Sequence, residues 1–454
     1  MSKFVDKLKN IKFVKTLVNI FSVEDLRARI LITLGFILVY RFGSNVILPG
    51  IDAENLQKLH DQTSSGLMSL LDMFSGGAFS NASVFALGIM PYISASIVMQ
   101  LLGLAVPYFQ KMQREGESGR RKMSQYTRYL TVLILLFQAP AYLINLKMQT
   151  SGAGAGGAIS ASISWTAFLI TSTIILAAGS MFILWLGERI TDKGIGNGVS
   201  LIIMIGIIAR FPKAFIQEFG SREASQGGLV FILLEIVVLL AVIAAAVMLV
   251  QGTRKVPVQY AKRVVGNRTF GGARQYIPLK PYAANVMPII FAQAIMFIPA
   301  AVAGLFSNDS SSWLVQQLSD NTSALYCVIF AVLIILFTYL YTAITINPVQ
   351  MAEDMKRNNG FIPGVKPGKA TADYIDNIMS KITFPGALFL AFLAILPAFA
   401  SMFDIKREFA QFFGGTSLLI LVGVVLDTLQ QIESHLMMRH YDGLLSTGRI
   451  RGEH

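Results

Sequence analysis

Charged residues and cysteine are both scarce in this chain of 454 residues. Asp, Glu, Lys and Arg together make up only 14% of the sequence, whereas soluble domains average about 25%. The single cysteine, Cys327, excludes an intrachain disulfide. The four histidines show no metal-ligand spacing. These shortages argue against a soluble, disulfide-stabilised or metal-dependent protein, and no cofactor is expected.

Long apolar blocks fill the sequence instead, and hydrophobic residues reach 54%. A transmembrane helix needs roughly 20 apolar residues to cross a hydrocarbon core of about 30 Å. Arg210 and Lys213 interrupt one block, which makes it the weakest candidate. The pattern predicts an all-α, polytopic membrane protein of about ten transmembrane helices. The predicted spans are 30–48, 82–104, 129–146, 164–187, 199–216, 228–250, 283–306, 324–346, 383–400 and 415–431.

The basic residues decide the orientation in the membrane. The net charge is +12, and 30 of the 38 Lys and Arg residues fall on one side of the predicted topology. Cytosolic segments carry such an excess of Lys and Arg in membrane proteins. We therefore expect both termini in the cytosol. The basic, amphipathic first 25 residues lack the continuous apolar stretch of a cleavable signal peptide.

Two predicted cytosolic loops, 252–282 and 347–381, are longer than ordinary connectors between packed helices. The first has seven basic residues and no acidic one, and valines and tyrosines alternate with the charges. That pattern favours a structured, protruding hairpin that binds an anionic cytosolic partner. In the second loop, Pro and Gly residues surround Lys366 and Lys369. The alternative is that these loops only fix the topology or contact anionic lipid.

Residues 67–81 form a short, glycine-interrupted apolar segment before the second predicted span. Gly76 and Gly77 are expected to end a short helix, and Ser80, Asn81 or Ser83 to cap the next one. A helix too short to span the membrane is tolerated at membrane depth only beside protein or a water-filled cavity. The segment therefore indicates a lumen. An amphipathic helix on the outer surface is the alternative.

The second and seventh predicted spans share the pattern Met-Pro-x-Ile-x-Ala, which begins at Met90 in one and at Met287 in the other. Each is the second full span of a set of five, so the two sets would have inverted topology. Inverted repeats place the functional site at the interface between the halves, near the midplane. A chance match of four positions is the alternative.

Ionisable residues are few within the predicted spans, and the clearest are Arg41, Glu235 and Asp427. An ion-coupled carrier normally concentrates acidic residues at its binding site. A hydrophobic constriction, which excludes water from a closed pore, fits this composition better. A secondary transporter that uses Glu235 or Asp427 remains the second candidate. The glycine-rich stretches GIGNG and GVKPGKAT lack the context of a nucleotide-binding site.

Six segments, in order along the chain, resemble the SecY family of channel subunits of the bacterial protein-export translocon. The resemblance extends over nearly the whole chain. The segments are MFSGGAFSNASVFALGIMPYISASIVMQLL (73–102), QREGESGRRKMSQYTRY (113–129), WLGERITDKGIGNGVSLII (185–203), YAKR (260–263), FIPGVKPG (361–368) and GGTSLLI (414–420).

The resemblance implies a protein-conducting channel rather than an enzyme. Two pseudo-symmetric halves, 30–220 and 221–431, would enclose an hourglass pore. The halves would be hinged at the loop near 217–228. Residues 1–29 before them and residues 432–454 after them would be cytosolic. A plug at about 65–80 would close the pore. Unfolded secretory polypeptides would cross the bacterial cytoplasmic (inner) membrane, and transmembrane segments would leave laterally into lipid. The implied partners are SecE, SecG, the SecA ATPase, the translating ribosome with its RNA, signal peptides and unfolded preproteins.

The resemblance also implies roles for particular residues. Val199 stands where the family commonly has isoleucine, and Lys366 where it has arginine. The implied pore ring is Ile89, Ile93, Val199, Ile203, Ile290 and Ile420; the plug is Leu67, Leu70, Leu71, Met73, Phe74, Gly76 and Gly77; the lateral gate is Pro91, Ser94, Ile97, Gln100, Pro288, Phe291 and Ala294; the docking residues for motor or ribosome are Arg254, Lys255, Lys262, Arg263, Lys366 and Lys369.

Overall fold

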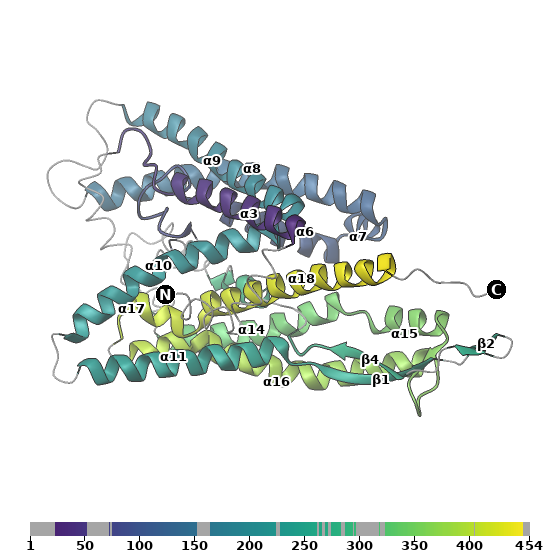
Figure 1. Cartoon of the computed structure of the whole chain (residues 1–454). Coiled ribbons are helices and arrows are strands. Elements are labelled where there is room, and N and C mark those ends of the chain that lie inside the picture. The colour runs from purple at the N-terminus through teal and green to yellow at the C-terminus, as the bar shows by residue number, and fades with distance from the viewer. Residues whose placement is uncertain are drawn as a thin grey trace. The chain divides into compact units, whose positions relative to one another are not determined.

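The chain forms two compact units in a computed structural model (Figure 1). Unit 1 comprises residues 1–210 and 424–454, and unit 2 comprises residues 211–423. The structure describes residues 23–51, 72, 75–151, 164–223, 228–260, 263–265, 268–270, 274–282, 287–293, 295–296, 317, 323–403 and 405–447.

Unit 1 is a helical unit in which α8 packs against α6, α7 and α9. One core cluster joins α8 and α9 to the turns that precede α6, with Leu48, Phe79, Tyr142 and Phe168 among its buried side chains. Apolar burial of this kind contributes roughly 25 cal/mol per Å². The elements are α3 (Glu24–Gly43), α6 (Met90–Ala105), α7 (Pro107–Arg114), α8 (Glu117–Ser151), α9 (Trp165–Lys193), the first part of α10 (Gly198–Glu223) and the last part of α18 (Gly415–Thr447).

Unit 2 combines long helices with a three-stranded and a two-stranded sheet, and α14 packs along α16. Pro385 and Pro397 lie inside α16, and both leave a helical carbonyl without its usual donor. The elements are the last part of α10, α11 (Gly228–Gln251), β1 (Arg254–Tyr260), β2 (Arg263–Val265), β3 (Arg268–Phe270), β4 (Arg274–Leu279), α14 (Ala324–Thr345), α15 (Pro348–Arg357), β5 (Gly360–Phe361), α16 (Lys369–Ser401), α17 (Arg407–Ala410), η2 (Gln411–Phe413) and the first part of α18.

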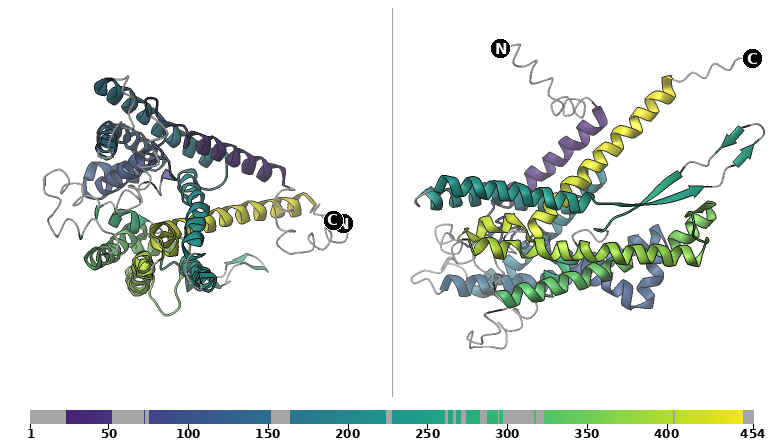
Figure 2. Two further views of the ribbon diagram at one scale, coloured as in Figure 1. Left: turned by 90° about the vertical axis from the view of Figure 1, so that its left-hand side faces the viewer. Right: turned by 90° about the horizontal axis from the view of Figure 1, so that it is seen from below.

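The 252–282 loop forms a β-hairpin that projects from the helices of unit 2 (Figure 2). β1 pairs antiparallel with β4, with Val256 opposite Ile277, and also with β5. Along β1, Val256 and Val258 are buried while Lys255 and Pro257 are exposed, which is the two-residue period of a strand with one covered face. The buried face packs on Met355 and Ile375. The expectation of a structured hairpin is confirmed.

The all-α membrane fold is confirmed, with eight of the ten predicted spans represented. Among the described residues, seven helices are long and apolar enough to cross a membrane, and the bent pair of α6 and α7 adds an eighth. The predicted span 30–48 falls largely on α3, which also carries Arg27, Arg29 and Arg41. The predicted span 283–306 lies mostly outside the described residues.

The predicted start of the second span is wrong. Residues 76–89 form turns on both sides of an isolated β-bridge from Ser83 to Ile47, and α6 begins only at Met90. The backbone of Gly88 has φ +54° and that of Ala82 has φ +44°, a left-handed conformation that a right-handed helix cannot include. The N-cap of α6 is Ile89, without a side-chain capping bond. Ser80, Asn81 and Ser83 therefore do not cap this helix.

Candidate functional site

Two of the predicted plug residues, Gly76 and Gly77, lie in what we call the glycine segment (Asp72 and residues 75–80). Gly76 has φ +66° and Gly77 has φ +90°. A Cβ atom on Gly76 would lie 2.7 Å from the Cα of Gly206 in α10. Both the positive φ and this close approach require glycine at position 76. Leu67, Leu70, Leu71, Met73 and Phe74 lie outside the described residues.

A buried ion pair attaches the glycine segment to α10. The Oδ2 atom of Asp72 lies 3.0 Å from Nη2 of Arg210, and the two side chains are only 2% and 14% exposed. The Oδ1 atom of Asp72 accepts a hydrogen bond of 2.7 Å from the amide of Ser80. One carboxylate thus satisfies both a guanidinium and a backbone donor. Such charge-assisted bonds are roughly twice as strong as neutral ones.

Two other helices of unit 1 also bond to the glycine segment. From α3, the hydroxyl of Tyr40 donates to the Ser75 carbonyl and Arg41 donates to the Gly76 carbonyl, both at 3.2 Å. From α8, the hydroxyl of Tyr142 donates to the Phe79 carbonyl at 2.8 Å. The segment contains turns whose carbonyls lack helical partners, so these side chains supply the missing donors. It is therefore held by side chains rather than by regular secondary structure.

The six predicted ring residues are divided between the two units. Ile89 and Ile203 of unit 1 and Ile420 of unit 2 are buried. Ile93 and Val199 of unit 1 and Ile290 of unit 2 are half-buried. All six are branched and apolar. That these six residues together form one ring around a pore stays a prediction.

The predicted lateral-gate residues also come from both units. In unit 1, Pro91 lies in the first turn of α6, and Pro91 and Ile97 are buried. Ser94 and Gln100 are half-buried, and the amide of Gln100 donates to the Ser96 hydroxyl at 3.3 Å.

In unit 2, Pro288 and Phe291 are buried. The Phe291 ring packs against Phe337 and Tyr341 of α14, with centroids 5.6 and 5.5 Å apart. Ala294 lies outside the described residues. The role of these residues as a gate stays a prediction.

The two predicted cytosolic loops form one sheet in unit 2. Gln259 and Tyr260 of β1 pair with Phe361 and Gly360 of β5. The second loop then turns at Gly364 (φ +85°) and Gly368 (φ +103°) before α16 begins.

Four of the predicted docking residues lie at the surface of this sheet, of the loop after β5 or of the start of α16. Arg254, Lys255, Lys366 and Lys369 are exposed. The carbonyl of Lys366 accepts a hydrogen bond of 2.9 Å from the hydroxyl of Thr371, which fixes the loop backbone. Arg263 belongs to β2, and Lys262 lies outside the described residues.

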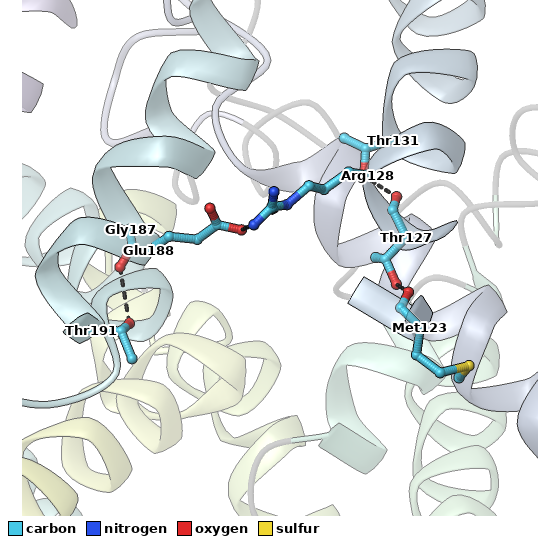
Figure 3. Close-up of polar contacts among 7 residues, drawn as sticks. All are labelled: Met123, Thr127, Arg128, Thr131, Gly187, Glu188 and Thr191. Carbon is cyan, nitrogen blue, oxygen red and sulfur yellow. Dashed lines mark hydrogen bonds and ion pairs between the residues drawn. The ribbon is translucent and has the colours of Figure 1, made fainter. Parts of the chain in front are cut away.

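An ion pair between α8 and α9 was not predicted. The Nε and Nη2 atoms of Arg128 lie 3.1 and 2.7 Å from Oε1 of Glu188 (Figure 3). Both residues lie within segments that resemble the SecY family, and Figure 3 shows them reaching toward one another from separate helices. The side chains are 46% and 33% exposed, so the pair contributes at most about 1 kcal/mol.

A second unpredicted cluster lies in unit 2. Arg222 pairs with Glu218 at 3.0 Å and with Glu235 of α11 at 2.9 Å. The other oxygen of Glu218 accepts a hydrogen bond of 2.8 Å from the Lys406 amide, and Arg222 donates to the Phe403 carbonyl at 3.1 Å. Isolated charges in apolar sequence are the signal for such clusters. This signal identified Glu235 but not its partners.

Asp427, the other acidic candidate for a transport site, is exposed and lies 3.5 Å from Gln431. Within the described part of the chain, no three His, Cys, Asp or Glu side chains are placed to hold a metal ion.

Comparison with known proteins decides between the remaining classes. The SecY family model matches residues 83–429. The chain belongs to the SecY family. It is 43% identical over 439 residues to protein translocase subunit SecY of Halalkalibacterium halodurans, with 95% of this chain and 99% of the relative covered. It is 41% identical over 434 residues to the Streptomyces coelicolor subunit of the same name, with 94% and 98% covered.

Solved structures agree with this SecY fold. A protein conducting channel matches with a TM-score of 0.60 at 18% identity, over 90% of this chain and 92% of that chain. The yeast Ssh1 complex, solved on the yeast 80S ribosome, matches with a TM-score of 0.57 at 13% identity, over 92% and 90%. The resemblance inferred from the sequence is confirmed. A SecY protein is a multi-pass membrane channel for protein translocation, not an enzyme.

Proposed function

We propose that this chain passes unfolded secretory polypeptides across the bacterial cytoplasmic membrane and releases transmembrane segments laterally into lipid. The observation that carries the proposal is the side-chain attachment of the glycine segment within unit 1. A segment that closes a pore must be held firmly when idle and must detach without unfolding a helix. Turns held by a few ionic and hydrogen bonds meet both requirements, because local opening then breaks only those bonds.

The apolar ring of Ile89, Ile93, Val199, Ile203, Ile290 and Ile420 forms the constriction in this proposal. Branched apolar side chains dewet an empty constriction and so block ions. They also offer a passing polypeptide no fixed polar contact. The burial of Ile203 and Ile420, which are 5% and 3% exposed, supports such a role.

Signal peptides would enter between α6 and the 287–296 region, which carries Pro288 and Phe291. Pro91 lies in the first turn of α6, where a backbone amide has no helical acceptor, so proline is accommodated there without loss of a helical hydrogen bond.

The energy for transport would come from partners that dock on the cytosolic sheet. Four exposed cations, Arg254, Lys255, Lys366 and Lys369, stand on a substructure with its own apolar core. This arrangement suits the acidic surface of a motor such as SecA or the RNA of a translating ribosome. Lys366 keeps the charge of the arginine usual in the family but makes no bidentate contact. SecE and SecG would be the membrane partners, and both termini would lie in the cytosol.

The test is reconstitution. The purified chain with SecE and SecG is placed in liposomes, and SecA, ATP and an unfolded preprotein are added outside. The proposal expects the preprotein to become resistant to added protease, and only when ATP is present. Equal protection in liposomes that lack this chain would contradict it. The structure gives a secondary transporter little support, because Glu235 is already paired with Arg222.

A further inference from the structure

Two carboxyl groups share one guanidinium within unit 2. Arg222, near the end of α10, lies 3.0 Å from Oε1 of Glu218 and 2.9 Å from Oε1 of Glu235 in α11. The side chains of Glu218, Arg222 and Glu235 are only 2%, 16% and 5% exposed. If both carboxyl groups were ionised, the cluster would hold one more negative charge than positive, away from water. A buried charge without a counterion of its own is costly.

The hydrogen-bond donors are divided unequally between the two carboxyl groups. Both oxygens of Glu218 accept, one from Nε of Arg222 at 3.0 Å and the other from the Lys406 amide at 2.8 Å. Glu235 is bonded through Oε1 to Nη2 of Arg222, which also donates to the Phe403 carbonyl. Among the described residues, Oε2 of Glu235 is buried without a hydrogen-bond partner. Because donors favour the ionised form of a carboxyl group, Glu218 is the better place for the negative charge.

The elements around this cluster bring few other charges to it. Glu235 is the one charged residue of α11, whose neighbours η2 and the 382–401 part of α16 have no Asp, Glu, Lys or Arg. On α10 after Pro212 and on the turn that leads into α17, the other charged residues with described side chains are three exposed cations and one half-buried acid: Lys213, Lys406, Arg407 and Glu408. The buried charge balance is therefore set by Glu218, Arg222 and Glu235.

We propose that Glu235 is a proton-binding site, with a proton on Oε2 at neutral pH. The cluster then has no net charge, because Glu218 alone balances Arg222. Oε1 of Glu235 still accepts from Nη2 of Arg222. The uncharged hydroxyl at Oε2 costs less to leave unpaired than an anion would at the same buried position.

Loss of this proton would place two anions on one guanidinium and weaken the attachment of α10 to α11. In the predicted topology, residues 217–228 lie outside the cytosol, so the attachment responds to the pH of the outer solution. None of the three residues belongs to the predicted ring, gate or docking surface.

Infrared spectroscopy of the full chain in lipid nanodiscs tests for the proton. A protonated carboxylic acid has a carbonyl stretch that a carboxylate lacks. The native chain should show this band at neutral pH, and Glu235→Gln should lose it. Glu218→Gln should lose it too, because the carboxylate that competes for Arg222 is gone and Glu235 then ionises. Glu188→Gln, in the exposed pair with Arg128, is the control and should keep it.

Three spectra would overturn the proposal. The first is a native spectrum without the band. The second is a band that survives in Glu235→Gln, which would belong to another carboxyl group. The third is a band that survives in Glu218→Gln, which would exclude the shared guanidinium as its cause.

Thermal unfolding decides which of the two carboxyl groups holds the proton. Glutamine has the shape of a neutral carboxylic acid, so Glu235→Gln should keep the native unfolding temperature at neutral pH. Both oxygens of Glu218 accept hydrogen bonds, so Glu218→Gln sets an amide donor against another donor and should lower that temperature. The opposite order would place the proton on Glu218 and overturn the proposal, as would equal unfolding temperatures.

The same measurement at several pH values reports the proton directly. Unfolding exposes Glu235 to water and releases the proton, so the native unfolding temperature should fall as pH rises above neutral. Glu235→Gln has no such proton and should fall less over the same range. Equal falls would mean that Glu235 is already ionised in the folded chain, which contradicts the proposal.

Discussion

Arg210 of α10 and Asp72 of the glycine segment form a buried ion pair, with Nη2 and Oδ2 3.0 Å apart. The two residues are 138 positions apart in the sequence, so the ion pair is a long-range contact. It joins a segment made of turns to a membrane-length helix. In the proposed channel this pair keeps the idle pore shut.

Asp72→Asn should loosen the glycine segment. The substitution keeps an oxygen that can accept from the Ser80 amide but removes the charge beside Arg210. Breaking one side of a buried pair costs about 3–5 kcal/mol. We expect the idle channel to leak small ions, measured as conductance in planar bilayers.

The control for that variant is Glu188→Gln, which breaks the exposed pair with Arg128. An exposed pair is worth at most about 1 kcal/mol, so conductance should stay low. Native conductance in Asp72→Asn would show that the pair does not hold the pore closed.

Ile420→Asn should make the constriction wet and shift the channel toward its open state. A polar side chain in an apolar ring stabilises water there. Export of passengers with defective signal sequences should rise, measured by the amount secreted. Ile174→Asn, at a position that is 64% exposed on α9, is the control and should not relax selectivity. A fall in stability without relaxed selectivity for Ile420→Asn would indicate ordinary helix packing.

Reversing two of the predicted docking charges, Arg263→Glu in β2 with Lys366→Glu in the loop after β5, should abolish motor-driven export. The variant should still insert and assemble, because surface substitutions rarely change stability by more than about 0.5 kcal/mol. Export of a preprotein into liposomes is the measurement. Arg407→Glu, at the exposed first residue of α17, is the control. Normal export by the double variant at physiological salt would exclude a docking role.

Tyr282→Phe should leave stability unchanged or raise it. The hydroxyl of Tyr282 is buried and has no hydrogen-bond partner among the described residues, and burial raises the pKa of Tyr282 above its ordinary value of 10.0. A buried, unsatisfied hydroxyl costs about 1–3 kcal/mol. Tyr142→Phe is the contrasting variant, because it loses a 2.8 Å bond to the Phe79 carbonyl and should destabilise by about 1 kcal/mol.

The two tyrosine variants are compared by thermal unfolding in detergent. Above pH 10 the unfolded state releases the Tyr282 proton before the folded state does, so this group lowers stability as pH rises. Tyr282→Phe should therefore lose less stability than the native chain between pH 8 and pH 10.5. Equal losses would mean that Tyr282 ionises freely in the folded protein.

Apolar blocks and basic loops predicted most of the architecture, because each depends on local composition. The length of a transmembrane span and the excess of Lys and Arg on one side of the membrane can be predicted without knowledge of tertiary contacts. The hairpin was also predictable, since Val256 and Val258 alternate with exposed residues. Its pairing with Gly360 was not, because about a hundred residues separate the two loops.

The start of α6 and the ion pairs could not be predicted for a different reason. Ala82 and Gly88 take positive φ values that tertiary contacts impose on an apolar, helix-prone sequence. In the sequence, Arg210 only interrupts a predicted span. Its pairing with Asp72 is seen only in the folded structure. The family resemblance predicted a plug at this segment but not the contacts that hold the segment.

The central claim, that polypeptides cross at the isoleucine ring, is tested by photo-crosslinking. A photoreactive amino acid replaces Ile93, Ile203, Ile290 or Ile420 in turn, and a preprotein is stalled in mid-passage. The account predicts crosslinks from all four positions to the stalled chain and none from Ile174 on the exposed face of α9. Crosslinks to lipid or neighbouring helices alone, with the preprotein stalled and protected from protease, would contradict it.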